Sequence, residues 1–349
     1  MGRKEKTIVV FCPNWVGDVV MATPAFSSIR RTYPEAQIVG VIRPYARGVI
    51  EDGPWFDSIL DCNDKRADGF FRLIGALRRL QPDTAILFRH SFRSALIARL
   101  GKAAKIYGYR RDGRSLLLSD GPAPERNGSG FLPRATMDSY LDLCRFLKLK
   151  TDEESIPRLY FSGEGAEAGN KLLRKYGIDS GDMVIGINPG AKFGSSKCWP
   201  PEYFAQLCEL IQKQWKCKIL LFAGPGEDEI ARTIVEQSPA TIINTGPDRV
   251  DLALLKPLIN RCNLLITNDT GPRHYGVAFS VPVVVIMGPT NPVYTASNLD
   301  KSVVLRKEMD CSPCHKRTCP YGHHNCMKMI TPDEVLQAGI QLLEEVQNS

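Results

Sequence analysis

Hydrophobic and polar positions divide this chain into short apolar runs and longer amphipathic stretches. The apolar runs are the length of strands buried on both faces, and apolar residues recur at helical spacing between them. The runs predict strands at residues 7–12, 36–43, 57–62, 84–88, 105–109, 183–188, 218–223, 241–244, 264–268 and 281–287. Helical spacing predicts helices at residues 19–33, 70–81, 92–100, 135–149, 200–216, 228–237, 250–261 and 332–346. This alternation is typical of βαβ units and parallel sheets.

The length of the chain indicates two domains. A single core rarely organises 349 residues. Residues 150–162 contain Pro157 and resemble a passage between domains. We therefore predict an α/β protein with two Rossmann-like domains facing a cleft, the first at residues 1–162 and the second at residues 163–331. In such sheets the ligand lies at the carboxyl ends of the strands.

A strand, a turn and a helix start follow one another at residues 264–278. The apolar run ends at Asn268-Asp269, and a turn through Thr270 and Gly271 opens the next helix. The free N–H groups and the dipole of a helix start attract an anion, so we expect Thr270 and Gly271 to hold a phosphate. A carboxylate would repel that anion, so Asp269 is better suited to sugar hydroxyls. An ordinary helix cap is the alternative interpretation.

A second loop of this kind spans residues 188–200. It follows a predicted strand and combines two glycines and two serines with two lysines. Backbone amides, the Ser196 hydroxyl and the Lys197 ammonium group together predict a diphosphate site. The order of residues is not that of a P-loop, and a flexible surface loop is the alternative.

Two carboxylates stand at other strand ends. Asp18 follows the first strand, where it is a candidate general base or else a helix cap. Glu227 follows the strand at 218–223 and is a candidate for binding ribose hydroxyls, unless it only favours the next helix start. The first turn lacks the glycine fingerprint of dinucleotide-binding dehydrogenases. No Asp-x-Asp triplet occurs in the chain, so a metal that bridges nucleotide phosphates has no obvious ligands.

Positive charge is concentrated in the first half. Residues 1–150 contain 25 Lys and Arg against 15 Asp and Glu, whereas the remainder contains 20 against 23. This excess predicts an anionic partner for the first domain, or merely a solvated basic face. No nucleic-acid module accompanies it, so we expect no nucleic-acid partner. Arg89 and Arg93, at a strand end in this half, are candidates for acidic groups of the partner, and surface salt bridges are the alternative.

These motifs, taken together, resemble those of the family 9 glycosyltransferases, the bacterial lipopolysaccharide heptosyltransferases, and within them the heptosyltransferase II group. Four stretches carry the resemblance and span nearly the whole chain: Asn14–Pro24, Pro189–Pro200, Asn268–His274 and Gly288–Pro292. The resemblance implies a GT-B fold, with the acceptor on the first domain and the nucleotide sugar on the second. It also implies that the last helix, within residues 332–349, crosses back to join the first domain.

The resemblance further implies inverting transfer of heptose from ADP-heptose to the inner core of lipopolysaccharide, without a metal or another cofactor in catalysis. By position, Asp18 resembles the catalytic base and Lys197 the phosphate-binding lysine, while Asp269 would hold the heptose and His274 lies in the same loop. The chain has no segment resembling a signal peptide or membrane span, so we expect a cytoplasmic protein, peripheral at the inner membrane. A sister transferase with another core position or sugar and a non-catalytic nucleotide-sugar-binding protein are the rival interpretations.

A cysteine-rich segment near the C-terminus is not explained by glycosyl transfer. Cys311, Cys314, Cys319 and Cys326 are interleaved with three histidines. Four thiolates at short spacing suit structural zinc, although the gaps are not those of a standard zinc ribbon. Free or partly buried thiols are the main alternative, since disulfides are disfavoured in the cytosol.

Overall fold

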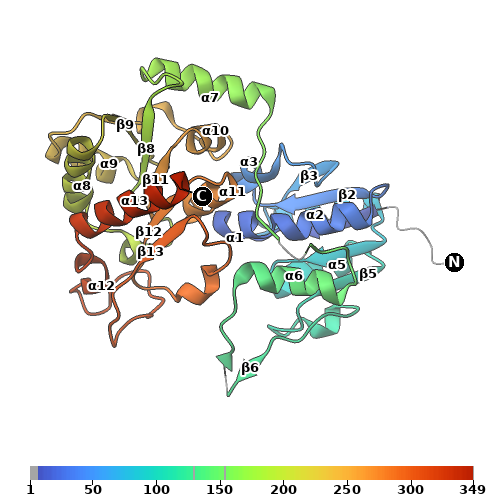
Figure 1. Cartoon of the computed structure of the whole chain (residues 1–349). Coiled ribbons are helices and arrows are strands. Elements are labelled where there is room, and N and C mark those ends of the chain that lie inside the picture. The colour runs from blue at the N-terminus through green and yellow to red at the C-terminus, as the bar shows by residue number, and fades with distance from the viewer. Residues whose placement is uncertain (1–6, 129, 153–154, 349) are drawn as a thin grey trace. The chain divides into compact units, whose positions relative to one another are not determined.

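The computed structural model describes residues 7–128, 130–152 and 155–348 (Figure 1). The chain forms two compact units. The first extends to Tyr160 and includes the short segment Val293–Ser297, and the second comprises Phe161–Pro292 and the chain from Asn298 onward. The predicted boundary at residue 162 lies two residues beyond this division.

The first unit is built on a parallel sheet with the strand order β3-β2-β1-β4-β5. All five residues of β1 are buried, because neighbouring strands flank it and helices cover both faces of a sheet of this kind. The chain order reverses between β1 and β4, which makes their carboxyl ends the expected ligand position. The strands are β1 (Thr7–Phe11), β2 (Gln37–Ile42), β3 (Ser58–Asp61), β4 (Thr84–Leu87) and β5 (Lys105–Gly108).

The helices of the first unit fall into two groups by their contacts. Helices α1 and α2 contact α6, while α4 contacts α5 and packs with it on one face of the sheet. A small antiparallel hairpin lies between β5 and α6. The elements are α1 (Val16–Met21), α2 (Thr23–Thr32), η1 (Pro44–Ala46), α3 (Arg47–Ile50), α4 (Ala67–Leu80), α5 (Phe92–Leu100), η2 (Ser115–Leu117), β6 (Arg126–Asn127), β7 (Gly130–Phe131) and α6 (Thr136–Phe146).

The second unit repeats this architecture with the parallel strand order β10-β9-β8-β11-β12-β13. Here the chain order reverses between β8 and β11, so the loops that follow these two strands flank the expected ligand position. The strands are β8 (Met183–Asn188), β9 (Cys217–Leu221), β10 (Ile242–Asn244), β11 (Leu264–Asn268), β12 (Val283–Ile286) and β13 (Ser302–Leu305).

One continuous hydrophobic core joins α8, α9 and α13 to a face of this sheet, and α10 contacts both α7 and α11. The elements are α7 (Gly163–Lys175), η3 (Ser195–Lys197), α8 (Pro201–Gln214), α9 (Asp228–Gln237), η4 (Gly246–Asp248), α10 (Leu255–Asn260), α11 (Gly271–Ala278), α12 (Asn325–Lys328) and α13 (Pro332–Gln347). The short helix η5 (Pro292–Thr295) lies almost entirely within the segment Val293–Ser297 of the first unit.

The C-terminal helix α13 corrects one expectation. It begins with a capping box formed by Thr331 and Glu334, and it packs on α8 and on the strands β11, β12 and β13 of the second unit. Gly339 faces the sheet so closely that a Cβ there would lie 3.0 Å from a methyl group of Leu264. The expectation that this helix crosses back and joins the first domain is therefore wrong, because its apolar face is buried in the second unit.

Other elements differ from the prediction for local reasons. The helix expected at 19–33 begins at Val16 and is divided at Ala22. Pro24 has no N–H for the carbonyl of Val20, and the Thr23 hydroxyl donates to that carbonyl instead, at 2.8 Å. Helix α7, strand β13 and the β6–β7 hairpin were not predicted. Among the described residues, no helix has both the length and the apolar composition that a bilayer crossing needs.

Candidate active site

The carboxyl ends of β8 and β11 hold the candidate donor site in the second unit. Two asparagines tie the loops after these strands together. Asn188 Nδ2 donates to the hydroxyls of Thr267 at 3.0 Å and Thr270 at 3.2 Å. Asn268 donates through Nδ2 to the carbonyl of Pro189 at 2.6 Å and accepts from the Trp199 N–H at 3.1 Å. The two loops predicted to bind a diphosphate are thus joined directly.

Asp269 is the ionic centre of this region. Its Oδ2 accepts from Lys197 Nζ at 2.7 Å and from the Thr290 hydroxyl at 2.7 Å, and its Oδ1 accepts from Arg273 at 2.8 Å. Burial by itself would raise the pKa of Asp269, but the charges of Lys197 and Arg273 outweigh it and hold the pKa well below the usual range. The carboxylate is therefore ionised at any working pH and fixes the position of Lys197.

The start of helix α11 is not capped by the side chain of its N-cap residue. Thr270 is the N-cap, and within the described residues its side chain accepts no hydrogen bond from the first helical turn. The Thr270 hydroxyl instead pairs with Asn188, which leaves the amides of the turn after Gly271 without a side-chain cap. The capping alternative is therefore disfavoured, and the helix dipole is directed at the same region as Lys197.

The cysteine-rich segment at residues 311–326 forms hydrogen bonds with the loop at 188–200. The Ser196 N–H donates to the carbonyl of Arg317 at 3.0 Å, and the Ser196 hydroxyl donates to that of Lys316 at 2.5 Å. A ring nitrogen of His324 lies 2.8 Å from the Ser196 carbonyl. Gly194 has φ +154°, and a Cβ there would lie 2.3 Å from the Arg317 carbonyl. Ser196 is thus buried and engaged in positioning the loop, which the sequence did not reveal.

Glu227 lies at the neighbouring strand end, after β9. Its Oε2 accepts from the Gly224 N–H at 2.8 Å, and a Cβ on Gly190 would collide with its carboxylate at 1.9 Å. Burial raises the pKa of Glu227, while the Gly224 N–H and the charge of Lys192 oppose the rise. The carboxylate is held between the two loops, where it can accept hydrogen bonds from hydroxyl groups.

His274 is buried in the first turns of α11. Burial and, to a smaller extent, the charge of Arg273 lower its pKa to about 3. The imidazole is therefore neutral at physiological pH. It contributes to the loop without adding charge.

Asp18 lies at the switch point of the first unit, in the first turn of α1. The N-cap of that helix is Trp15, so Asp18 does not cap it. The Asp18 side chain is partly exposed, and its charge raises the pKa values of Tyr45 and Tyr140, although burial is the larger cause for both tyrosines. A partly exposed carboxylate at this strand end is suitably placed to accept a proton from a bound hydroxyl.

The arginines predicted to bind the acceptor differ in environment. Arg89 is buried, and it pairs with Asp64 at 3.1 Å and contacts the Cys62 sulfur at 2.8 Å. Arg43 pairs with the other oxygen of Asp64 at 2.7 Å. Arg93 is exposed, and its guanidinium donates to the Asp64 carbonyl. Arg89 and Arg43 thus hold the Asp64 carboxylate at the carboxyl end of the sheet, while Arg93 contacts the Asp64 backbone and remains accessible to an anion.

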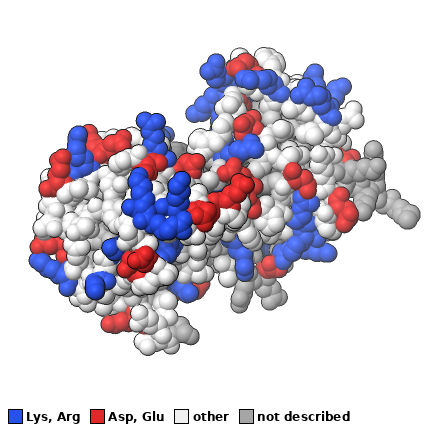
Figure 2. All heavy atoms as spheres, turned by 90° about the horizontal axis from the view of Figure 1, so that it is seen from above, with Lys and Arg blue, Asp and Glu red and all other residues white. Residues whose placement is uncertain are grey.

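Charges elsewhere on the surface are mixed. Figure 2 shows Lys and Arg interspersed with Asp and Glu over one face of the molecule, without a single continuous basic field on that face. The Asp64 cluster is therefore a more specific anion-binding candidate than the net charge of the first half.

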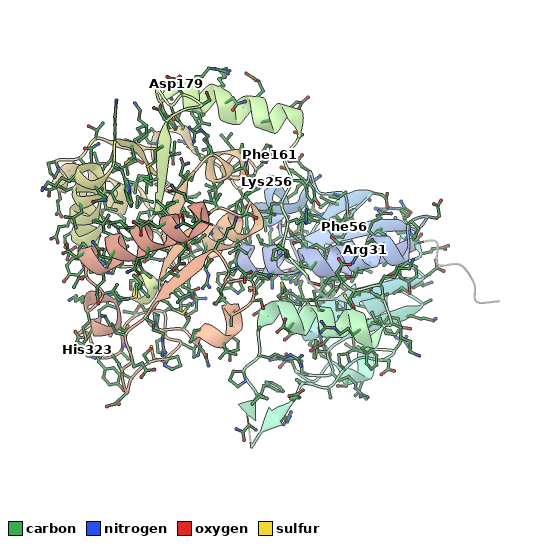
Figure 3. All side chains as sticks on the ribbon, viewed as in Figure 1. Arg31, Phe56, Phe161, Asp179, Lys256 and His323 are labelled. Carbon is green, nitrogen blue, oxygen red and sulfur yellow. The ribbon has the colours of Figure 1, made fainter. Side chains whose placement is uncertain are left out.

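The four cysteines of the C-terminal segment line one small pocket together with His323 and His324. Figure 3 shows His323 at the margin of the second unit. Burial, together with the three other cysteines, raises the pKa of Cys326 to about 11. Among the described residues, no three His, Cys, Asp or Glu side chains are arranged to hold a metal ion. The structural zinc expected at Cys311, Cys314, Cys319 and Cys326 therefore stays a prediction.

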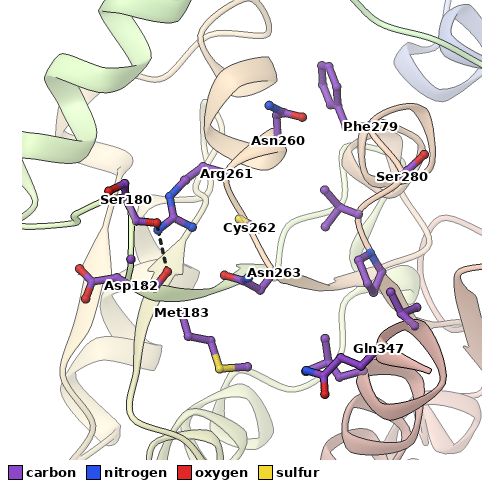
Figure 4. Close-up of a pocket in the computed structure, with 15 residues that line it drawn as sticks. Ser180, Asp182, Met183, Asn260, Arg261, Cys262, Asn263, Phe279, Ser280 and Gln347 are labelled. Carbon is purple, nitrogen blue, oxygen red and sulfur yellow. Dashed lines mark hydrogen bonds between the residues drawn. The ribbon is translucent and has the colours of Figure 1, made fainter. Parts of the chain in front are cut away.

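A larger pocket of about 630 Å³ lies at the opposite ends of the same strands (Figure 4). Its lining includes Met183 at the start of β8 and Val281 just before β12, and Arg261 donates to the Asp182 carbonyl at its edge. Ligands of parallel sheets bind at the carboxyl ends of the strands. The volume alone therefore does not make this pocket the active site.

Sequence reasoning did not single out several residues that build the donor region: Asn188, Arg273, Thr290 and His324. Arg273 lies one helical turn after Asp269, a spacing that could have indicated an ion pair. The partners of Asn188 and His324 lie at least 79 residues away in the chain, so no local pattern in the sequence indicates these contacts.

Comparisons with known proteins agree with this arrangement. A family model for glycosyltransferase family 9 (heptosyltransferase) matches residues 70–325. Lipooligosaccharide heptosyltransferase 2 of Haemophilus ducreyi is 29% identical, over 96% of this chain and 99% of the relative. The structure of a family 9 glycosyl transferase from Veillonella parvula has a TM-score of 0.84 at 26% identity and covers 99% of both chains.

The structure of ADP-heptose lps heptosyltransferase II from E. coli has a TM-score of 0.80 at 24% identity, over 98% of this chain and 99% of that one. The chain therefore has the GT-B fold, as its two parallel α/β units already indicated. The family model covers well over half of the chain. The chain belongs to glycosyltransferase family 9, and it is a heptosyltransferase.

Proposed function

We propose that this enzyme transfers heptose from ADP-heptose to the inner core of lipopolysaccharide, at the position used by heptosyltransferase II. The similarity to the Haemophilus ducreyi relative over nearly the full length of both chains supports this position. The observation that carries the donor assignment is the uncapped start of α11 beside Lys197, since both favour a diphosphate.

In the proposed reaction, Asp18 accepts the proton of an acceptor heptose hydroxyl. The oxygen attacks the anomeric carbon of ADP-heptose from the side opposite the diphosphate, and the bond from that carbon to the diphosphate breaks. The anomeric centre is inverted and ADP leaves. General-base assistance of this kind typically contributes a factor of about 10²–10⁴.

Negative charge grows on the leaving diphosphate during this step. Lys197 and the amides at Thr270 and Gly271 are assigned to stabilise this charge. Ser196 is assigned to hold the loop at 188–200 in position. Donors aimed at developing charge are typically worth about 3–4 kcal/mol each. These protein groups perform the role that a bridging metal has in other transferases, and the absence of an Asp-x-Asp triplet is consistent with metal-independent transfer.

The remaining residues are assigned either to the donor or to the acceptor. Glu227 is proposed to bind ribose hydroxyls, and the neutral His274 to support the same loop. Asp269 is buried and already accepts from three side chains, so we assign it mainly to positioning Lys197, with its remaining acceptor capacity available to the heptose. Arg93, oriented by the Arg89–Asp64 pair, is proposed to bind an acidic group of the acceptor.

The acceptor is a lipid, so the proposed function places the enzyme peripherally at the cytoplasmic face of the inner membrane. This requires no cofactor and no nucleic acid. The sister transferase and the non-catalytic binder remain the alternatives that an assay must separate.

The test is incubation with ADP-heptose and lipid cores that carry no heptose, one heptose or two, followed by mass measurement of each product. We expect only the core with one heptose to gain a heptose, with or without EDTA. A gain on a different core would indicate a sister transferase. ADP-heptose binding without any product would indicate a binding protein, and loss of transfer in EDTA would contradict the metal-independent mechanism.

A further inference from the structure

Large aromatic side chains are exposed at the starts of α4 and α5. Phe71 is 68% exposed and Phe92 is 50% exposed. Helix α4 directs Leu73, Ile74 and Leu77 into the core, and Phe71 lies outside that stripe, so packing of the helix does not account for it. Exposed large apolar groups that lie near one another commonly mark an interaction surface.

These aromatics connect by contact to the acceptor cluster. The rings of Phe70 and Phe71 meet edge to face, with centroids 5.4 Å apart. The Arg93 guanidinium lies 5.7 Å from the Phe70 ring centre, and it also donates to the Asp64 carbonyl. Phe92 precedes Arg93 at the first position of α5. We call Phe70, Phe71 and Phe92 the aromatic rim.

Cations accompany the rim. Lys65 and Arg66 immediately precede α4, and Arg72 follows Phe71. The side chains of Arg66 and Arg72 are 82% and 74% exposed, and both pair with the single carboxylate of Asp68. The three cations and Arg93 therefore outnumber the carboxylate, which leaves a positive surface around exposed aromatic rings.

Aromatic rings flanked by Lys and Arg are typical of the interface between a bilayer and water. The rings enter the headgroup region, and the cations attract anionic lipids at about 1 kcal/mol each. A stable protein partner would bury about 800 Å² on each side, whereas two exposed phenylalanines supply only a few hundred at most. The chemistry of the patch thus favours a lipid surface.

We propose that the aromatic rim, with Lys65, Arg66 and Arg72, docks the first unit onto an anionic phospholipid bilayer. The rim adjoins Arg93, so docking there brings the carboxyl end of the β1–β4 switch point to the membrane surface. This inference rests on the proposed function in one respect, since the purpose of docking is to capture a lipid-anchored acceptor. The docking itself needs no acceptor.

The experiment is sedimentation of the full-length protein with vesicles that contain no glycolipid. One set is phosphatidylethanolamine with phosphatidylglycerol, and the other is phosphatidylcholine alone. We expect binding to the anionic set and little to the neutral one. The double variant Phe71→Ser, Phe92→Ser should bind the anionic vesicles about tenfold or more weakly, since each ring loses its apolar burial.

Leu116→Ser is the matched apolar control, because Leu116 is 96% exposed in the same unit but lies on η2. It should bind like the wild type. The proposal is overturned if the wild type does not sediment with anionic vesicles, if the double variant binds unchanged, or if Leu116→Ser reduces binding equally.

The charge is tested separately with Arg66→Gln, Arg72→Gln, which should reduce binding to anionic vesicles about tenfold and weaken its dependence on salt. The control is Arg174→Gln, Lys213→Gln, because these exposed residues of the second unit are also paired with single carboxylates. An equal loss of vesicle binding in both double variants would indicate that positive charge acts non-specifically, and this result would overturn the proposal. Transfer to a water-soluble core oligosaccharide lacking lipid should persist in every variant, so failure of the docking and failure of the proposed reaction are distinguishable.

Discussion

Individual charged side chains in the donor region are held in buried ion pairs. Asp269 holds Lys197 and Arg273 in a buried arrangement, and each charge makes the others tolerable away from water. A buried carboxylate in this position is unusual for a phosphate site, because it repels the ligand. The carboxylate instead fixes the ammonium group of Lys197, which donates twice to Asp269 and has one N–H left to donate to an anion.

Asp18→Asn should reduce turnover about 10²–10⁴-fold and leave ADP affinity nearly unchanged, because the amide cannot accept the acceptor's proton. Steady-state kinetics and calorimetric titration with ADP measure the two effects. Asp138→Asn is the matched control, since Asp138 also lies in the first turn of a helix of the first unit. A parallel loss of ADP binding and turnover would show that Asp18 has a structural role.

Lys197→Ala should weaken ADP-heptose binding and also reduce turnover about 10²-fold or more, because a donor to the diphosphate is lost. Binding is measured by titration and turnover by product mass. Lys213→Ala is the control, since Lys213 is an exposed lysine of the same unit and pairs with Glu209 on α8. Unchanged donor affinity in Lys197→Ala would remove this lysine from the phosphate site.

The buried His274 should make stability depend on pH. Its folded-state pKa is about 3, and the unfolded value is about 6.5. Between these values only the unfolded chain binds the proton, so the free energy of unfolding falls as the pH is lowered below about 6.5. At pH 5 this amounts to about 2 kcal/mol for His274. Denaturant unfolding at pH 5 and pH 7.5 should therefore show a smaller pH effect in His274→Gln, and an equal effect would contradict the neutral, buried imidazole.

At the scale of elements, loops distant in the chain stabilise one another. The loop at 188–200 receives hydrogen bonds from β11 and from the cysteine-rich segment, and Trp199 is anchored in the core through its ring N–H to the Ile330 carbonyl at 2.9 Å. The cysteine-rich segment is thus a support for the donor loop.

His324→Asn should therefore raise the KM for ADP-heptose several-fold with a smaller change in kcat, because the contact to the Ser196 carbonyl is lost. Asn suits the left-handed backbone of this position, where φ is +57°, so strain is avoided. His323→Asn is the control, because the His323 ring stacks on Tyr321 instead. Equal effects of the two substitutions would contradict the support by His324.

At the scale of the whole molecule, strand and helix periodicity predicted most of the architecture. Ten of the strands of the two parallel sheets were predicted, because buried parallel strands are nearly continuous apolar runs. Strand β13 was missed because it is only half-buried at the edge of its sheet. Helix α7 was missed because its first half is rich in Gly and Glu and has few apolar residues. The GT-B fold persists at 24–26% identity because burial pattern, more than residue identity, specifies it.

The sequence by itself determined the α/β class, the two-domain organisation, the strand ends that carry the candidate residues, and the family. These follow from local periodicity and short motifs, which the neighbours of each residue encode. Only the tertiary structure decided that Asp269 holds Lys197, that Arg89 is buried against Asp64, that His324 supports Ser196, and that α13 packs on the second unit. Those contacts join residues far apart in the chain. They form and contribute to stability only after the intervening loops have closed.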